Sequence, residues 1–258
     1  MKYPSNRERS LLQKLIRPSQ RKKAGLFIAE GRRVVEQIIQ SAFLACEFIL
    51  VPETEFESWD KKATHCRVLA GEPALLDQIS ATSHSQQIFA ICREPGPATP
   101  EDFSKVDGLL VAGDALQDPG NAGTIYRSAV WFGASGWIQG KGTVDLFQPK
   151  VVRSTAGATG ALPHLYGELT NILPQLTNLG WEVSILDLKP DSVSLHEWQP
   201  SAKHILVVCN EGRGPSPEIA DQYPTLKIPG ASARAVESLN ASISAGIAIH
   251  SWFEKMSR

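Results

Sequence analysis

The chain has 258 residues and a formal net charge of −1 at pH 7; 42% of its residues are hydrophobic and 21% are charged, which is typical of a globular protein with one large or two modest domains. The four cysteines form no CxxC pair and no cluster with histidine, which argues against a metal site and a disulfide framework and favours the reducing cytoplasm. No apolar run approaches the ~20 residues of a membrane span.

Basic residues dominate positions 1–25. Against the single acid Glu8, this stretch holds Lys2, Arg7, Arg9, Lys14, Arg17, Arg21, Lys22 and Lys23. A run of one charge at a terminus often marks contact with a polyanion such as nucleic acid. The solvated polar face of a helix explains the same run without any ligand, so the charge pattern alone leaves both interpretations open.

Residues 1–94 alternate between strand and helix patterns, which predicts a small α/β domain. The predicted strands are LFIAE, CEFILV, RVLA and QIFAIC, and the predicted helices are Arg7–Ile16, RRVVEQIIQSA, a short one near Trp59, and PALLDQI. Pro95, Pro97 and Pro100 follow in close succession, and neither helix interiors nor sheet interiors tolerate such a cluster. We therefore predict an interdomain linker over residues 95–106.

Residues 107–258 repeat this alternation with longer elements. Predicted strands are GLLVAG, GWIQ, WEVSILDL, HILVVC and TLKI, and predicted helices follow the first strand and cover Pro149–Ala156, NILPQLTNLG and about Glu237–Lys255. Several of these strands, HILVVC above all, are continuously apolar, as expected for parallel strands that are covered on both faces. The predicted fold class is therefore α/β, with a small N-terminal α/β domain and a C-terminal α/β domain built on a parallel sheet.

The first chemically informative loop is DPGNAGTIYRSAVWFGASG, at positions 118–136. Pro119 and Gly120 suit a turn, and Asn121 is a good N-cap for the helix that follows. Arg127 does not fit this simple connection, because a cation in the early part of a helix opposes the helix dipole. Its side chain is expected to lean back over small residues toward Asn121. Two interpretations stay open: a bound anion or substrate near the helix N-terminus, and a buried ion pair.

Two further loops follow strands of the predicted parallel sheet. CNEGRGPS follows HILVV at the carboxyl end of a strand, where ligands of open α/β sheets bind, and it supplies the Glu211 carboxylate beside Gly212 and Gly214. IPGASARAVESLNASISAGIAIH places Ser238 and Asn240 at a helix start, where either residue suits a cap. The small residues of that helix allow another element to approach it closely. Neither a P-loop nor a GxGxxG fingerprint is present.

Together, in order and spacing, these three loops resemble the three motifs of the SpoU/TrmH family of RNA ribose 2′-O-methyltransferases in the SPOUT superfamily. PKVVRSTAGA also looks like this family, and LFIAEGRRVVEQII resembles the ribosomal-protein-like RNA-binding domain that precedes the catalytic domain in many members. The resemblance implies an RNA-binding domain at residues 1–94 and a catalytic domain at residues 107–258. It further implies a deep trefoil knot that binds S-adenosylmethionine (SAM), no metal, and a homodimer whose active sites are completed across the interface.

The resemblance also implies roles for individual residues. The expected active-site residues are Asn121, Arg127, Glu211, Ser238 and Asn240. The expected cofactor contacts are Cys209, Asn210, Glu211, Gly212, Gly214, Ile228, Pro229, Gly230, Ser238 and Leu239. The expected RNA contacts are Arg7, Arg9, Arg21, Lys22, Lys23, Arg32 and Arg127. Because a guanidinium does not readily deprotonate, we expect Arg127 to hold the adjoining phosphate, with Glu211 and a water as candidates for accepting the proton.

Two positions depart from the family pattern, and both lie on loops expected to surround the cofactor. Cys209 stands where glycine is usual, and Gly230 stands where methionine is common, in a loop that is about two residues longer. The extra N-terminal domain favours ribosomal RNA over tRNA as the substrate. A non-catalytic RNA-binding relative is a second hypothesis, and an unrelated nucleotide-binding α/β enzyme is disfavoured by the missing phosphate fingerprints.

Overall fold

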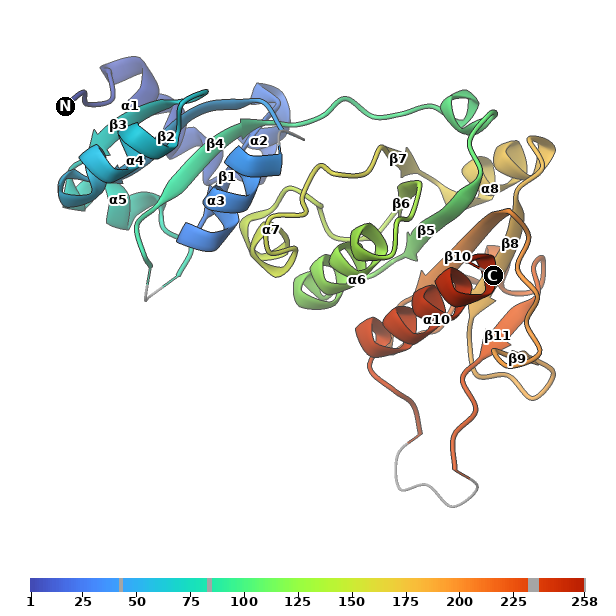
Figure 1. Cartoon of the computed structure of the whole chain (residues 1–258). Coiled ribbons are helices and arrows are strands. Elements are labelled where there is room, and N and C mark those ends of the chain that lie inside the picture. The colour runs from blue at the N-terminus through green and yellow to red at the C-terminus, as the bar shows by residue number, and fades with distance from the viewer. Residues whose placement is uncertain (42–43, 83–84, 232–236, 258) are drawn as a thin grey trace. The chain divides into compact units, whose positions relative to one another are not determined.

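The computed structural model describes residues 1–41, 44–82, 85–231 and 237–257. They form two compact units (Figure 1). The first unit comprises Met1–Pro95 and Asp145–Ala161, and the second comprises Gly96–Val144 and Leu162–Arg258. The chain therefore leaves the first unit after residue 95, returns to it after residue 144, and enters the second unit again after residue 161. We call Asp145–Ala161 the inserted segment.

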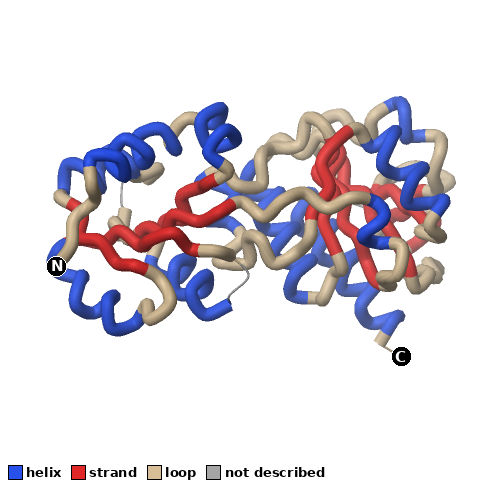
Figure 2. Tube along the Cα trace, turned by 90° about the horizontal axis from the view of Figure 1, so that it is seen from above, coloured by secondary structure: helices blue, strands red, loops and turns tan. Residues whose placement is uncertain are grey.

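The first unit is built on a four-stranded sheet of order β1-β4-β2-β3. Its strands are β1 (Leu26–Glu30), β2 (Cys46–Pro52), β3 (Arg67–Gly71) and β4 (Phe89–Arg93). β4 is antiparallel to β1 and to β2, while β2 and β3 are parallel. The helices, on both sides of the strands (Figure 2), are α1 (Asn6–Leu15), α2 (Pro18–Ala24), α3 (Arg32–Ser41), α4 (Phe56–Lys62), α5 (Pro73–Ile79) and α7 (Pro149–Ser154), with the 3₁₀ helix η1 (Glu53–Glu55).

Local sequence signals account for the first two helices. α1 begins with a capping box, in which Ser5 and Glu8 satisfy each other's backbone N–H groups, and its bounds lie within one residue of the prediction. α2, which the sequence analysis did not predict, has Pro18 in its first turn and ends at Gly25, whose φ of 60° suits glycine. α1 and α5 bury apolar residues against alternate positions of the strands: Leu12, Leu15, Leu75, Leu76 and Ile79 against Ile28, Phe48, Leu50, Leu69, Phe89 and Ile91.

The second unit is built on a seven-stranded sheet of order β7-β6-β5-β10-β8-β11-β9, in which the paired strands run parallel. The strands are β5 (Gly108–Asp114), β6 (Gly136–Gly140), β7 (His164–Gly167), β8 (Glu182–Leu186), β9 (Val193–Ser194), β10 (Lys203–Cys209) and β11 (Thr225–Lys227). The predicted α/β class with a parallel sheet is therefore confirmed. The short strands β7 and β9 were not predicted.

Helices cover both faces of this sheet. On one face, α6 (Pro119–Trp131) and α10 (Ala241–Met256) lie side by side (Figure 1). On the other face lie the 3₁₀ helix η2 (Pro100–Phe103), α8 (Leu169–Asn178) and the short α9 (Pro217–Ala220). Alternate strand residues such as Leu110, Val183 and Ile205 pack against α8. No helix within the described ranges has both the length and the apolar character that a membrane crossing requires.

Two details of the predicted helices need correction. The N-cap of α6 is Asp118, whose Oδ1 accepts a hydrogen bond from the Asn121 N–H over 2.7 Å, so Asn121 lies inside the first turn rather than capping it. Pro119 causes this shift, because proline is favoured in the first turn of a helix. α10 starts at Ala241 rather than near Glu237, because Asn240 is its cap.

Candidate functional site

Loops at the carboxyl ends of three neighbouring strands and the start of α10 enclose a cavity of about 360 Å³ in the second unit. Ligands of parallel sheets bind at this edge because the loops there are free to converge. The lining residues are Leu186, Asp187 and Leu188 from β8; Val208, Cys209, Asn210, Glu211 and Gly214 from β10; Leu226, Lys227, Ile228, Pro229, Gly230 and Ala231 from β11; and Glu237, Ser238, Leu239, Ala241 and Ser244 around the start of α10.

Every residue of the predicted cofactor set except Gly212 lines this cavity. Gly212 lies within the same loop, where its N–H donates to Asn210 Oδ1 over 3.0 Å. The structure therefore brings together the residues that the second and third motifs contribute. Their roles as cofactor contacts stay a prediction.

The loop after β10 is held in a defined shape. Asn210 donates from Nδ2 to the Ala115 carbonyl over 3.0 Å, and Ser216 donates from its N–H and its hydroxyl to the buried Asp114 carboxylate, each over 2.6 Å. Gly214 has a φ of 68°, which glycine adopts without strain. The loop is thus fastened to the end of β5 at both of its ends, which fixes where Glu211 lies.

The chemistry of the cavity wall suits a ligand with both apolar and charged parts. Leu226, Ile228 and Leu239 provide apolar surface, while the carboxylates of Asp187 and Glu237 provide hydrogen-bond acceptors. Burial raises the pKa of the Cys209 thiol, with further raising by the nearby Asp114 and Asp187. Cys209 is therefore a neutral thiol that contributes wall surface and not a nucleophile.

The cavity residues at the end of β8, and several at the start of α10, were not predicted from the sequence. Leu186, Asp187 and Leu188 end the predicted strand WEVSILDL. The rule that directed attention to the carboxyl ends of the other strands applies equally to this one and would have found them.

Three of the predicted active-site side chains form a continuous hydrogen-bonded chain. Asn240 donates from Nδ2 to Asn121 Oδ1 over 3.1 Å, and Asn121 donates from Nδ2 to Glu211 Oε1. A second hollow of about 330 Å³ is lined by Asn121, Asn210 and Glu211 together with Leu116, Gln117 and Asp118. Glu211 therefore borders both hollows, and its carboxylate is oriented by an amide.

The other two predicted active-site residues, Ser238 and Arg127, lie outside this hydrogen-bonded chain. Ser238 is exposed and lines the first cavity. Arg127 is exposed on α6, and within the described residues it makes no hydrogen bond or ion pair. The ion-pair interpretation of Arg127 thus finds no partner in the described part of the chain, which favours the interpretation that it awaits an anionic ligand.

Several predicted RNA contacts in the first unit are engaged in ion pairs. Arg9 binds Glu72 over 2.7 Å and Arg32 binds Glu55 over 2.6 Å. Arg21 is only 2% exposed and directs its guanidinium at Asp145, over 3.2 Å. Arg7, Lys22 and Lys23 are exposed. Arg7 and Lys23 are therefore better placed than the buried Arg21 to reach an external polyanion.

No group of three or more His, Cys, Asp or Glu side chains lies together as a set of metal ligands in the described residues. The four cysteines are free. Buried His164 and His204 lie in the second unit, and burial lowers the pKa of each imidazole.

Comparison with known families identifies the chain. Residues 108–250 match the model of the SpoU rRNA Methylase family, and residues 9–90 match that of the MRM3-like substrate binding domain. Because the first match covers more than half of the 258 residues, the chain belongs to the SpoU rRNA methylase family. The family resemblance predicted from the three motifs is confirmed.

Individual relatives agree over nearly the whole chain. The Bacillus subtilis protein named 23S rRNA (guanosine(2553)-2′-O)-methyltransferase RlmP is 29% identical over 92% of this chain and 92% of its own length. A solved structure from Porphyromonas gingivalis, assigned to the TrmH family of RNA methyltransferases, is 30% identical with a TM-score of 0.81 and covers 96% of this chain and 98% of its own. The AdoMet-bound rRNA methyltransferase of Sinorhizobium meliloti is 26% identical with a TM-score of 0.82, over 98% and 97% of the two chains.

Proposed function

We propose that this protein transfers the methyl group of SAM to the 2′-hydroxyl of a ribose in ribosomal RNA. The observation that carries the proposal is the cavity at the carboxyl ends of β8, β10 and β11, which meets the Glu211–Asn121–Asn240 hydrogen-bonded chain at Glu211. Membership of the SpoU family supports the methyl transfer. The name of the Bacillus relative supports the ribose 2′-hydroxyl of ribosomal RNA as the acceptor.

The cavity fits SAM in size and in chemistry. Its volume of about 360 Å³ lies within the range of small-molecule sites. Apolar residues from two loops, Ile228 and Leu239, would flank the adenine ring, and the carboxylate of Glu237 or Asp187 would accept hydrogen bonds from the ammonium or hydroxyl groups. The AdoMet complex of the Sinorhizobium relative supports this assignment. Bound there, SAM supplies a methyl group already activated by its sulfonium.

The remaining chemistry falls to residues of this chain. Asn121 holds one oxygen of Glu211, which leaves the other oxygen free to accept the proton of the ribose hydroxyl directly or through a water. Arg127 would hold the adjoining phosphate and so fix the hydroxyl for in-line attack, since a planar guanidinium matches phosphate oxygens in pairs. A guanidinium stays protonated in proteins, so we assign the proton to Glu211 and not to Arg127.

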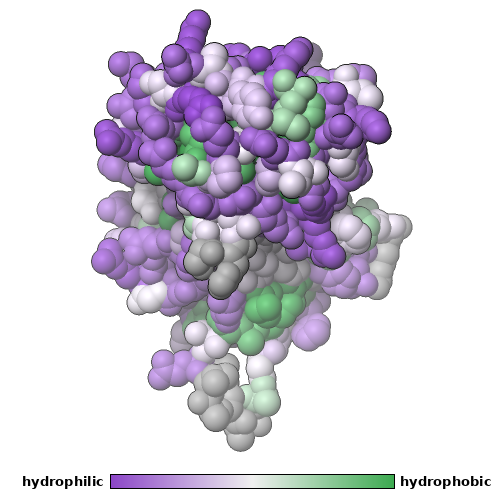
Figure 3. All heavy atoms as spheres, turned by 90° about the vertical axis from the view of Figure 1, so that its left-hand side faces the viewer, coloured by the Kyte–Doolittle hydropathy of each residue, from purple (hydrophilic) through white to green (hydrophobic). Residues whose placement is uncertain are grey.

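We also propose that the working form is a homodimer. α6 and α10 expose large apolar side chains, with Trp131 82% and Ile243 54% exposed; Ile247 of α10 and Leu239, just before the helix, are exposed as well. Figure 3 shows apolar atoms gathered in the lower half of one face of the molecule. A second copy would cover this surface, and an Ile243→Glu variant should then sediment as a monomer. A monomeric wild-type protein at micromolar concentration would contradict the dimer.

Three further expectations complete the proposal. The trefoil knot would involve the loops after β10 and β11 that line the cavity. The exposed Arg7, Lys22 and Lys23 of the first unit would contact the RNA backbone, so that binding weakens as salt rises. The site of action would be the cytoplasm, in keeping with four free cysteines.

The test begins with calorimetric titration of the protein with SAM and with its demethylated product. It continues with transfer of a labelled methyl group to ribosomal RNA from a strain that lacks the protein. Binding at micromolar strength, followed by label that survives alkaline hydrolysis as a 2′-O-methylated dinucleotide, supports the proposal. Label found in tRNA instead would mean that tRNA, and not ribosomal RNA, is the substrate. Absence of SAM binding both with and without RNA would favour a non-catalytic RNA-binding protein.

A further inference from the structure

The inserted segment belongs to one family match by its sequence position and to the unit of the other match by its packing. Asp145–Ala161 lies inside the match to the SpoU family at residues 108–250, yet it packs in the first unit with the substrate-binding match at residues 9–90. β6 ends at Gly140 before the segment, and β7 starts at His164 after it. Both ends of the segment therefore lead into neighbouring strands of the methyltransferase sheet.

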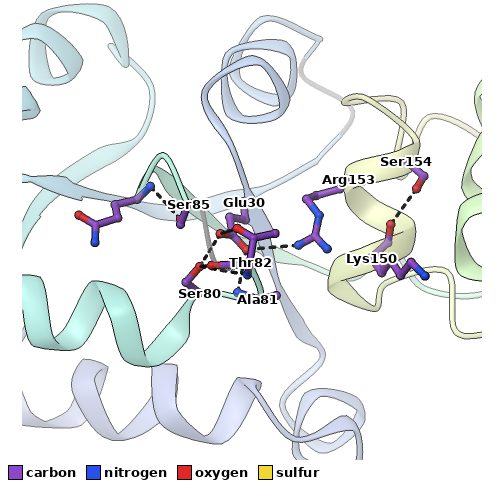
Figure 4. Close-up of polar contacts among 9 residues, drawn as sticks. Glu30, Ser80, Ala81, Thr82, Ser85, Lys150, Arg153 and Ser154 are labelled. Carbon is purple, nitrogen blue, oxygen red and sulfur yellow. Dashed lines mark hydrogen bonds and ion pairs between the residues drawn. The ribbon is translucent and has the colours of Figure 1, made fainter.

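Glu30 presents a buried carboxylate to this segment from the end of β1. It is 4% exposed and accepts hydrogen bonds from Ser80 Oγ over 2.7 Å, Ala81 N–H over 2.9 Å and Thr82 Oγ1 over 2.9 Å. Figure 4 shows these donors around one side of the carboxylate and Arg153 approaching from the other. Burial by itself raises the pKa of Glu30, but the hydrogen bonds outweigh it and the pKa is lowered, so the group is a buried anion.

Arg153, on the short helix α7, forms an ion pair with this carboxylate. Its Nη1 lies 3.4 Å from Glu30 Oε2, and its side chain stays partly exposed. Val151 and Val152 of the same helix are fully buried, and α7 packs on β1. Apolar contacts of this kind have no direction, so they hold a short helix on a sheet without fixing its position along the strand.

Other contacts fasten the two ends of the segment. Arg21 binds Asp145 over 3.2 Å, and the rings of Phe27 and Phe147 lie 5.1 Å apart. Near the other end, Gly157 has a φ of 96°, and a Cβ there would lie 2.4 Å from the Cβ of Gln37. The segment is thus held along its length, and Arg153–Glu30 is a directional contact made by its helix.

An ion pair with one buried partner is a poor source of stability, because desolvation offsets its attraction, but it can select one register among several. We propose that Glu30 and Arg153 are positioning residues for the RNA substrate: they fix the register of the inserted segment within the substrate-binding unit. This inference rests on the proposed function. Neither residue belongs to the cofactor cavity, so the pair acts on RNA and not on SAM.

The test uses Arg153→Met, which removes the charge and keeps the length, and Arg153→Lys, which keeps the charge. Glu30 retains three other donors in both variants. The matched control is Arg93→Met, which breaks the Arg93–Glu47 pair between β4 and β2 of the same unit without touching the segment. For each protein, the dissociation constant for SAM, the kcat and KM for ribosomal RNA from a strain lacking the protein, and the hydrogen exchange of residues 145–161 are measured.

We expect Arg153→Met to raise the KM for RNA at least 10-fold and to speed exchange in the inserted segment, with SAM affinity changed less than twofold. Arg153→Lys should recover most of the KM, and Arg93→Met should match wild type. An unchanged KM in Arg153→Met, or an equal rise in Arg93→Met, overturns the proposal. If the wild-type protein methylates no RNA, the proposed function fails; exchange then decides on its own whether the pair fixes the segment, and unchanged exchange overturns that too.

Discussion

Asn240 donates a hydrogen bond from Nδ2 to Oδ1 of Asn121 over 3.1 Å, across 119 positions of the chain. The same Asn240 side chain caps α10, because its Oδ1 accepts from the backbone N–H groups of Ser242 and Ile243. One amide therefore has two tasks: its oxygen caps the helix, and its nitrogen donates to Asn121 of the predicted active site. The two tasks can be separated by substitution.

Asn240→Asp should keep stability and lose activity. The carboxylate still accepts from the helix N–H groups, and a negative charge is favourable at a helix N-terminus. It has no N–H to donate to Asn121, and it adds a negative charge near Glu211, so methyl transfer should fall at least about 10-fold, the cost of roughly one lost hydrogen bond. Asn240→Ala should lose activity and also about 1 kcal/mol of unfolding free energy. Thermal denaturation and methyl transfer measure the two effects, and full activity in Asn240→Asp would contradict the role of its donor.

Arg127 should matter for catalysis and not for folding. It is exposed and has no hydrogen bond or ion pair within the described residues, so Arg127→Ala should change the unfolding free energy by no more than about 0.5 kcal/mol. Loss of the phosphate grip should lower methyl transfer on the order of 100-fold, the effect of a misplaced reacting group. SAM affinity should stay as in wild type, which calorimetry would show.

Arg127→Lys separates charge from geometry. An ammonium is a point charge and does not reproduce paired hydrogen bonds to a phosphate, so most of the activity should remain lost. A lysine variant with near wild-type activity would contradict paired hydrogen bonds from Arg127 to the phosphate and would leave only a general electrostatic role.

SAM should stabilise the protein through the cavity. A ligand that binds only the folded state at about 100 times its Kd adds about 2.7 kcal/mol, which for a chain of this size raises Tm by about 5–10 °C. Ser244→Phe places a ring in the cavity and should abolish the shift, whereas Glu254→Phe on the exposed part of α10 should keep it. Equal shifts in both variants would mean that the cofactor binds elsewhere.

Much of the fold was predictable because its long elements have strong local patterns. The apolar run HILVVC corresponds to β10, and the periodic residues near Arg7–Ile16 correspond to α1 within one residue at each end. The two-residue β9 and the four-residue β7 are defined by pairing with neighbours, so no local pattern marks them. α2 is different, since Pro18 and Gly25 were visible signals of its two ends.

The inserted segment shows where sequence reasoning stops. Its attachment depends on Arg21 with Asp145 and Glu30 with Arg153, pairs separated by 124 and 123 positions. A cation in a basic stretch carries no local sign of whether it faces solvent, so Arg21 was grouped with its exposed neighbours. The motif residues around the cavity were identified because their order is distinctive, while Asp187 was not because it follows an ordinary strand. The functions of the site residues remain predictions.

Buried His204 should make the protein less stable in mild acid. Its Nε2 lies 3.0 Å from Ser184 Oγ, its ring contacts Trp198, and burial lowers its pKa to about 4 from an ordinary 6.5. Between these two values the unfolded chain binds a proton that the folded protein does not, so the unfolding free energy falls as pH falls from 6.5 to 4. The loss approaches about 3 kcal/mol at the acid end of that window. His204→Gln stays neutral throughout, so the stability difference between wild type and variant should shift by about 2 kcal/mol between pH 7 and pH 4.5. Denaturant titrations at pH 7 and pH 4.5 measure it. A difference independent of pH would show that the pKa of His204 is the same in the folded and unfolded states.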